Sequence, residues 1–254
     1  MLFKEGEFRA FWFETGTPTF LVDRLASDKT WLPKLGQAQA DIDLLSTFDV
    51  SFISIEALMF QAGYLTIDRT ERSFGETLYF LRYPNQEVYQ SLSNALLRQW
   101  TDGIQHAQPV QLNKRSLGQL LLANDFNGMQ SLFSAFFASI PHDWYRNSPI
   151  AQYEGYYASV FYAYFASLGL DIVPEESSNA GRLDMAVRFN GNVYLFEFKV
   201  VELAPDGGAL RQIKERGYAD KYRALGQPIH LIGIEFSRDS RSVVGFEVES
   251  LITG

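Results

Sequence analysis

The chain has 254 residues, of which 46% are hydrophobic, and it carries a formal net charge of −8 without a single cysteine. This composition predicts a globular protein with a sizeable core, long enough for two modest domains. It excludes disulfides and cysteine-based zinc sites, and it argues against a protein that coats nucleic acid through bulk positive charge. No stretch approaches the roughly 20 apolar residues that span a bilayer, so we expect no membrane contact and a cytoplasmic location.

The first half of the chain predicts short helices and a pair of strands. Helices are expected around Thr19–Leu25 and over Ile53–Gln61. Alternating apolar residues predict strands at Tyr64–Asp68 and Thr77–Leu81, with Asp68–Glu76 as their polar connection. These elements and the next helix resemble a small winged-helix arrangement.

Pro84 ends the second strand, and Asn85 is placed to cap a helix over Glu87–Trp100. Leu, Phe and Ala at helical spacing predict one or two further helices between Ser116 and Ile140. Two proline-containing segments follow, at 141–143 and 147–149, and they mark a domain boundary. We therefore predict a mainly helical, winged-helix-like domain at 1–145 and an α/β domain at 146–254.

The second domain begins with a predicted helix at Ile150–Leu168 that is dense in Tyr, Phe and Ala. Its Glu154 shares a helix face with apolar residues such as Phe161, which is a poor position for a solvated carboxylate. A strand at Asp184–Phe189 and a strand at Val193–Val201 follow, joined by the Asn-Gly signal of a tight hairpin.

The second strand of this hairpin contains an unusual charge pair. Glu197 and Lys199 lie two positions apart in an otherwise apolar run, so their side chains share one face of the sheet. An isolated buried carboxylate costs on the order of several kcal/mol unless an ion, a proton or a partner compensates it. The hairpin brings Asp184 towards Glu197, and two carboxylates with one lysine can hold a hard divalent cation beside an ammonium.

Asp184 followed by Glu197-Phe198-Lys199 resembles the motif of the PD-(D/E)XK nuclease superfamily, which has the restriction-endonuclease-like fold. The order of elements agrees, with a helix at Ala209–Ile213 and a strand at Ile229–Phe236 after the motif. The resemblance implies an α/β domain with a mixed central sheet flanked by helices. Leu183 stands where the family motif has proline.

The resemblance also implies chemistry, namely a metal-dependent endonuclease that cuts phosphodiester bonds, most directly those of DNA. Asp184 and Glu197 would bind Mg²⁺ or Mn²⁺, together with Glu154 and the backbone carbonyl of Phe198. Lys199 would position the attacking water, and Glu197 and Asp184 would also serve catalysis through the ion. Gln212 would orient the lysine or a water.

A second resemblance covers the first domain. The segments 12–18, 61–67 and 83–88 are similar to the C-terminal part of bacterial AAA-ATPase-like proteins whose tail is a PD-(D/E)XK domain. The chain has no G-x-x-x-x-G-K-[ST] phosphate loop. We therefore predict no ATP hydrolysis, and a protein partner that supplies an ATPase is an open alternative.

Other interpretations of the same residues remain open at this stage. The nuclease-like fold could serve as an inactive module that binds nucleic acid or protein, with Lys199 in a buried ion pair. The basic residues after the motif, from Arg211 to Arg223, alternate with acids, which favours a mixed solvated face and a local nucleic-acid contact. Tyr218 is expected to be a packing residue. The three histidines are too scattered to suggest a zinc site.

Overall fold

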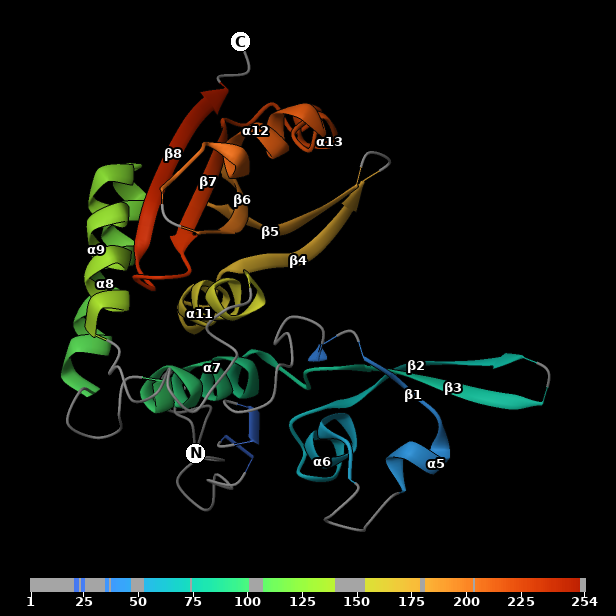
Figure 1. The fold of residues 1–254 in the computed structure, drawn as a ribbon. Coiled ribbons are helices and arrows are strands. Elements are labelled where there is room, and N and C mark those ends of the chain that lie inside the picture. Colours follow the sequence, from blue (N-terminus) through green and yellow to red (C-terminus); the bar gives the residue numbers. More distant parts are fainter. Residues whose placement is uncertain are drawn as a thin grey trace, which may run out of the picture.

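In a computed structural model of the protein, the described residues are 21–22, 24–25, 35–36, 38–46, 53–73, 75–100, 107–139, 154–178, 181–202 and 204–251. The first part of the chain forms short helices around a small sheet (Figure 1). Its elements are β1 (Gln39–Ala40), α5 (Ile42–Leu45), α6 (Ile55–Gln61), β2 (Thr66–Ser73), β3 (Glu76–Arg82) and α7 (Gln86–Trp100). Residues 21–22 and 24–25 are helical, as expected.

The helix α6 begins at Ile55 and α7 at Gln86, close to the predicted starts at Ile53 and Glu87. The Ser54 hydroxyl accepts a 3.1 Å hydrogen bond from the backbone N–H of Ala57 at the start of α6. The Asn85 side chain accepts a 2.9 Å bond from the N–H of Val88 at the start of α7. Both are N-cap bonds, which satisfy backbone donors that have no partner within the helix.

The small sheet differs from the prediction in one respect. Its strand order is β1-β3-β2, all antiparallel, and β2 extends through residues that the sequence predicts as a connection. Residues 69–73 are paired with β3 up to Glu76, so that part of the prediction is wrong. β2 lies at the edge of this sheet, and its residues 68–73 are all polar, so this part of the strand lacks the alternation of apolar and polar residues by which strands are recognised. The winged-helix resemblance stays a prediction.

Two further helices follow, α8 (Ala107–Ala123) and α9 (Phe126–Ser139), and they confirm the helical prediction for 116–140. The segments at 141–143 and 147–149 lie outside the described residues. The division into domains at 145/146 therefore stays a prediction. Described side chains from both sides of that point, such as Phe133 and Phe161, share one apolar cluster.

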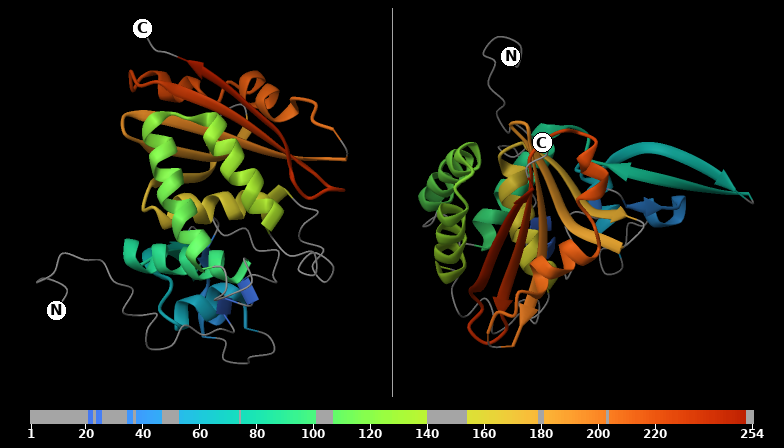
Figure 2. Two further views of the ribbon diagram at one scale, coloured as in Figure 1. Left: turned by 90° about the vertical axis from the view of Figure 1, so that its left-hand side faces the viewer. Right: turned by 90° about the horizontal axis from the view of Figure 1, so that it is seen from above.

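The second part of the chain forms a five-stranded sheet of order β4-β5-β6-β7-β8, with helices on both faces (Figures 1 and 2). Only β6 and β7 run parallel, and the other neighbours are antiparallel. The sheet is therefore mixed, as expected. Its elements are α11 (Glu154–Ser167), β4 (Asp171–Ser178), β5 (Gly181–Phe189), β6 (Asn192–Val201), α12 (Gly208–Glu215), α13 (Asp220–Arg223), β7 (Ile229–Ser237) and β8 (Val243–Leu251).

The hairpin between β5 and β6 turns at the Asn-Gly pair. Asn190 and Gly191 both have positive φ angles, of 48° and 74°. A two-residue hairpin loop with this backbone matches the twist of its flanking strands, and Asn and Gly adopt it at little cost. The predicted hairpin is confirmed.

The two faces of the five-stranded sheet differ in character. One face carries Phe196, Phe198 and Phe236 against α11, with ring centroids of Phe161 and Phe198 5.0 Å apart. On the opposite face, Leu195 of β6 shares an apolar cluster with Ile213 of α12 and Tyr222 of α13. Alternate residues of β6 thus enter different cores, as the pleat of a strand requires.

The first part of the chain packs on α11 through α7. The Gln86 side chain donates a 2.8 Å hydrogen bond to the carbonyl of Gly169, and the rings of Tyr89 and Tyr162 meet edge to face at 5.8 Å. Among the described helices, none is long and apolar enough to cross a membrane.

Candidate active site

The β5–β6 ladder ends just before the two acidic residues of the predicted motif. Its last described pair joins Met185 to Phe196, so Asp184 and Glu197 are the next residue on each strand. Residues opposite one another in an antiparallel pair lie on the same face of the sheet. The two carboxylates therefore emerge side by side on the face that α12 covers.

Asp184 is held against the neighbouring strand by a hydrogen bond to its side chain. Its Oδ2 accepts a 2.9 Å bond from the backbone N–H of Phe198. The carboxylate thus occupies the position that a backbone carbonyl would take if the ladder continued. Leu183, where the family motif has proline, is buried.

Glu197 is buried with 3% of its surface exposed. The side-chain amide of Gln212 on α12 donates a hydrogen bond to its Oε1. Such a bond offsets part of the cost of removing a carboxylate from water. Gln212 therefore reaches the site, although its predicted partner was the lysine or a water.

Gly233 on β7 explains how α12 comes so close to the sheet. It is the direct neighbour of Glu197 in the parallel ladder. A Cβ atom at this position would lie 2.7 Å from the Cα of Leu210, in the first turn of α12. Only glycine leaves room for the helix backbone, so Gly233 sets the depth at which Gln212 meets Glu197.

Tyr218 lies within electrostatic reach of the two carboxylates, although the sequence indicates only a packing role. Burial raises the pKa of its phenol, and the negative charges of Glu197 and Asp184 raise it further. Arg216 and a hydrogen bond with Gln212 lower the pKa. Because one hydroxyl responds to both carboxylates, Asp184 and Glu197 lie within electrostatic reach of the same group.

Lys199 lies two residues further along β6, on the same face and half-buried. Its Nζ would be 3.2 Å from a Cβ atom built at Gly208, so the ammonium lies at the beginning of α12. Within the part of the chain that the structure describes, no ion pair to Lys199 is found. The alternative of a buried ion pair with Glu197 or Asp184 is therefore not supported.

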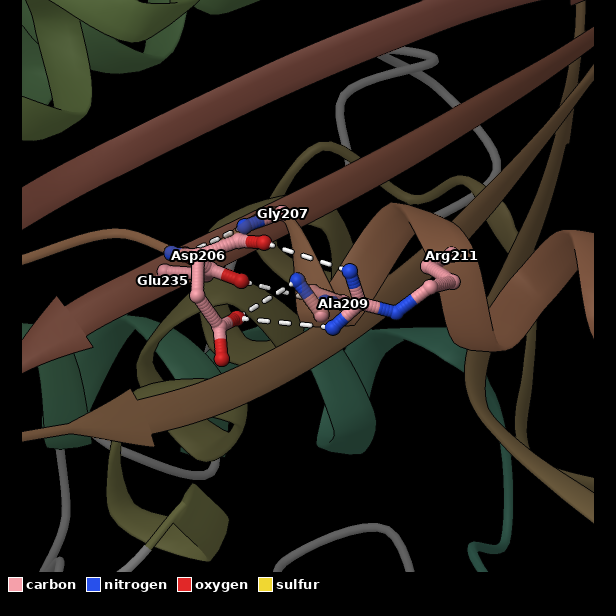
Figure 3. Close-up of polar contacts among 6 residues, drawn as sticks. Asp206, Gly207, Ala209, Arg211 and Glu235 are labelled. Carbon is pink, nitrogen blue, oxygen red and sulfur yellow. Dashed lines mark hydrogen bonds and ion pairs between the residues drawn. The ribbon is translucent and has the colours of Figure 1, made fainter.

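A third buried carboxylate lies beside the lysine. Glu235 on β7 is the direct neighbour of Lys199 in the ladder and only 2% of it is exposed. Figure 3 shows its two oxygens directed at backbone N–H groups before and within the first turn of α12. Oε2 accepts from Asp206 at 2.8 Å and from Gly207 at 3.3 Å, and Oε1 accepts from Ala209 at 3.1 Å.

The exposed Asp206 side chain also bonds the first turn of α12 (Figure 3). Its Oδ1 accepts a 2.7 Å hydrogen bond from the N–H of Gly208, and this bond is the largest cause that lowers the pKa of its carboxyl. The charges of Arg211 and Lys199 lower that pKa as well.

Glu154 is the first residue of α11, and its side chain lies outside the described part of the structure. Ring contacts fix the direction of the helix, because Phe165 lies by Phe196 while Tyr157 stacks on Phe236 at 4.0 Å. Its N-terminal end therefore approaches the carboxyl ends of β6 and β7. The N-terminal end of α11 therefore lies at the same end of the sheet as Lys199, but α11 covers one face of the sheet and Lys199 emerges from the other.

The described residues fit a metal ion in part. Asp184 and Glu197 supply carboxylate oxygens, which are the donors that Mg²⁺ prefers. No group of three or more His, Asp or Glu side chains suited to a metal is found among the described residues. Backbone carbonyls and water are further oxygen donors that such an ion accepts.

The described histidine plays a structural role. His230 bonds Ser250 and Asn192 through its two ring nitrogens, at 2.8 and 3.1 Å, and burial lowers its pKa. His106 and His142 lie outside the described residues.

Comparison with known proteins agrees with this geometry. Residues 152–246 match the family model of the PD-(D/E)XK nuclease superfamily. The chain is also 62% identical over 251 residues to an uncharacterized protein in the vnfD 5′ region of Azotobacter chroococcum mcd 1, covering 99% of this chain and 48% of that protein. The chain thus spans about half the length of this curated relative. No solved structure matches significantly.

The matched residues contain α11, the hairpin with its acidic pair, α12 and β7. The mixed sheet with helices on both faces is consistent with a restriction-endonuclease-like fold. Residues 152–246 of this chain are therefore a PD-(D/E)XK nuclease superfamily domain.

Proposed function

We propose that the protein hydrolyses phosphodiester bonds of nucleic acid, DNA in the first place, in a metal-dependent reaction. One observation carries the proposal. Asp184 and Glu197 stand side by side at the end of the β5–β6 ladder, on the face from which Lys199 also emerges. The superfamily match supports a nuclease but leaves its substrate and its metal open.

Asp184 and Glu197 would hold the Mg²⁺ or Mn²⁺ ion, with Glu154 as an added donor. The Phe198 carbonyl is suited to join them. In a strand, the N–H and C=O of one residue point to the same side, and the N–H of Phe198 points to Asp184. A bound divalent ion would supply a water of lowered pKa and offset the charge that develops on the phosphate.

Lys199 would position the attacking water and stabilise negative charge on the phosphate oxygens. Its ammonium is available for this role because no described carboxylate pairs with it. Gln212 would fix the orientation of the Glu197 carboxylate through its hydrogen bond. It is thus a positioning residue for the metal ligand.

Contact with nucleic acid would be local. The basic residues around α12 are partly neutralised, since Lys214 pairs with Glu249 at 2.6 Å and Arg223 with Asp220 at 3.0 Å. The first part of the chain would add a second contact if its α6, β2–β3 hairpin and α7 act as a winged helix, an arrangement that typically binds nucleic acid or protein.

The test is a cleavage assay on supercoiled DNA, linear DNA, single-stranded DNA and RNA, each with Mg²⁺ and with Mn²⁺. We expect cleavage by the parent protein and a loss of about 10²–10³-fold in Lys199→Ala. Arg115→Ala, which removes an exposed basic residue on α8, outside the basic run 211–223, is the control and should cut at the parent rate. Equal rates for Lys199→Ala and the parent would refute the assignment.

A binding or regulatory module without catalysis is the second candidate. The observation that favours it is the lack of a three-residue metal group among the described side chains. Gel-shift titrations with DNA, run with EDTA and then with Mn²⁺, separate the two functions. The module binds equally in both and never cuts, whereas the nuclease requires the metal for cleavage.

A third arrangement rests on the similarity of the first part of the chain to AAA-ATPase-like proteins. An ATPase partner in trans would then switch the nuclease on, while this chain hydrolyses no ATP because it lacks a phosphate loop. Adding a candidate ATPase and ATP to the same assay should raise the cleavage rate. Saturable ATP turnover by the pure chain would contradict this arrangement.

A further inference from the structure

We propose that Glu235 is a positioning residue of the candidate site, which holds the first turn of α12 so that Gln212 and Lys199 are correctly placed. The proposal rests on the proposed nuclease function. Glu235 belongs to neither the acidic pair nor the E-x-K motif. Its strand was predicted from the sequence, but its role was not.

The hydrogen bonds of Glu235 replace a missing cap. The N-cap residue of α12 is Gly207, which has no side chain to accept a bond from the helix. The Glu235 carboxylate reaches across from β7 and accepts three backbone N–H bonds, from Asp206, Gly207 and Ala209. A negative charge at a helix N-terminus is favourable, and its bonds to N–H groups are strong in a buried setting.

The turn that Glu235 holds touches the site at two points. Gly208 lies against the Lys199 ammonium, and Gln212 follows one helical turn later with its amide on Glu197. A shift of this turn moves both contacts together. Gly233, two residues earlier on β7, already fixes how deeply the helix sits. Glu235 fixes the position of the first residues of α12.

The same bonds keep Glu235 from neutralising the lysine. Glu235 and Lys199 are direct neighbours on adjacent strands, so an ion pair between them would be the simple outcome. The structure instead turns both carboxylate oxygens to backbone donors. The ammonium stays available to a phosphate or a water, while a negative charge remains nearby to stabilise it.

The experiment compares Glu235→Gln and Glu235→Ala with Glu249→Gln, a control that removes an exposed carboxylate contacting α12 through Lys214. Single-turnover cleavage should fall about 10²-fold in Glu235→Ala, the loss expected for small misplacements. Glu235→Gln keeps one acceptor oxygen and should lose less. The Mn²⁺ dissociation constant, by calorimetry, should rise by a much smaller factor than the rate falls, because the ligands Asp184 and Glu197 are kept and only the orientation of Glu197 through Gln212 changes. A metal affinity that falls as far as the rate would overturn the proposal.

A second readout needs no catalysis, so it separates failure of this inference from failure of the proposed function. The Gln212 side-chain amide should shift in ¹H–¹⁵N spectra of Glu235→Gln and stay in place in Glu249→Gln. In a Gln212→Ala background, Glu235→Gln should cost less in rate than in the parent. An unmoved Gln212 signal, or fully additive rate losses in a folded protein, would show that Glu235 only stabilises the loop.

Discussion

The two faces of the five-stranded sheet are built from alternate residues of the same strands, and they have different roles. On β6, Phe196 and Phe198 enter an aromatic core with α11, while Glu197 and Lys199 face α12. The packed rings on one face stabilise the folded protein, whereas burying charged side chains on the other face costs part of this stability. Substitutions on the aromatic face should therefore change stability, and those on the α12 face should change metal binding and rate.

Asp184→Asn should give the largest effect on the α12 face. Removing one of two carboxylate donors should weaken Mn²⁺ binding by at least about 10²-fold, as measured by calorimetry. The pKa of Tyr218 should fall towards its ordinary value because one nearby negative charge is gone. Alkaline titration of tyrosine signals follows this change. Unchanged metal affinity would mean that Asp184 is not a ligand.

Phe198→Ala tests the aromatic face. Its ring is buried with 1% exposed and packs against Phe161 and Phe236. Its loss should lower the free energy of unfolding by about 3–5 kcal/mol, from urea denaturation. A loss under about 1 kcal/mol would show that this face is not tightly packed.

Gly233→Ala tests the contact between the sheet and α12. The added methyl group meets the backbone at Leu210, so we expect about 1–3 kcal/mol of destabilisation and slower cleavage as Gln212 withdraws from Glu197. Gly118→Ala on α8 is the control, since nothing lies within 4 Å of its Cβ. That variant should gain about 0.5–1 kcal/mol.

Glu249→Gln should give the smallest effect. It breaks the pair with Lys214, in which both side chains are more than a third exposed. Exposed pairs of this kind contribute about 0.2–1 kcal/mol, screened by salt. A thermal melt at low and at high salt should show a small difference that vanishes at high salt.

The sequence predicts the hairpin and its charged residues because two local rules apply there. The Asn-Gly turn fixes the pairing, and the i, i+2 spacing puts Glu197 and Lys199 on one face. The same argument about a buried charge applies to Glu235 within its apolar strand. It was missed because its partners are backbone N–H groups, which no sequence pattern marks.

Other features lie beyond local rules. β4 contains Pro174 and several polar residues, so its alternation is weak, and it forms a strand by pairing with β5. The role of Gly233 depends on a helix that arrives from another part of the chain. The position of Tyr218 beside the carboxylates depends in the same way on how α12 leads into α13.

The most direct test of the α12 face as a nuclease site is the Mn²⁺-dependent rate of DNA cleavage by the parent protein and by Glu197→Gln. The variant keeps the shape of the buried side chain and removes its charge. We predict cleavage by the parent and a rate at least about 10²-fold lower in a folded Glu197→Gln. Equal rates, or no cleavage by the parent on any nucleic acid with either metal, would contradict the account.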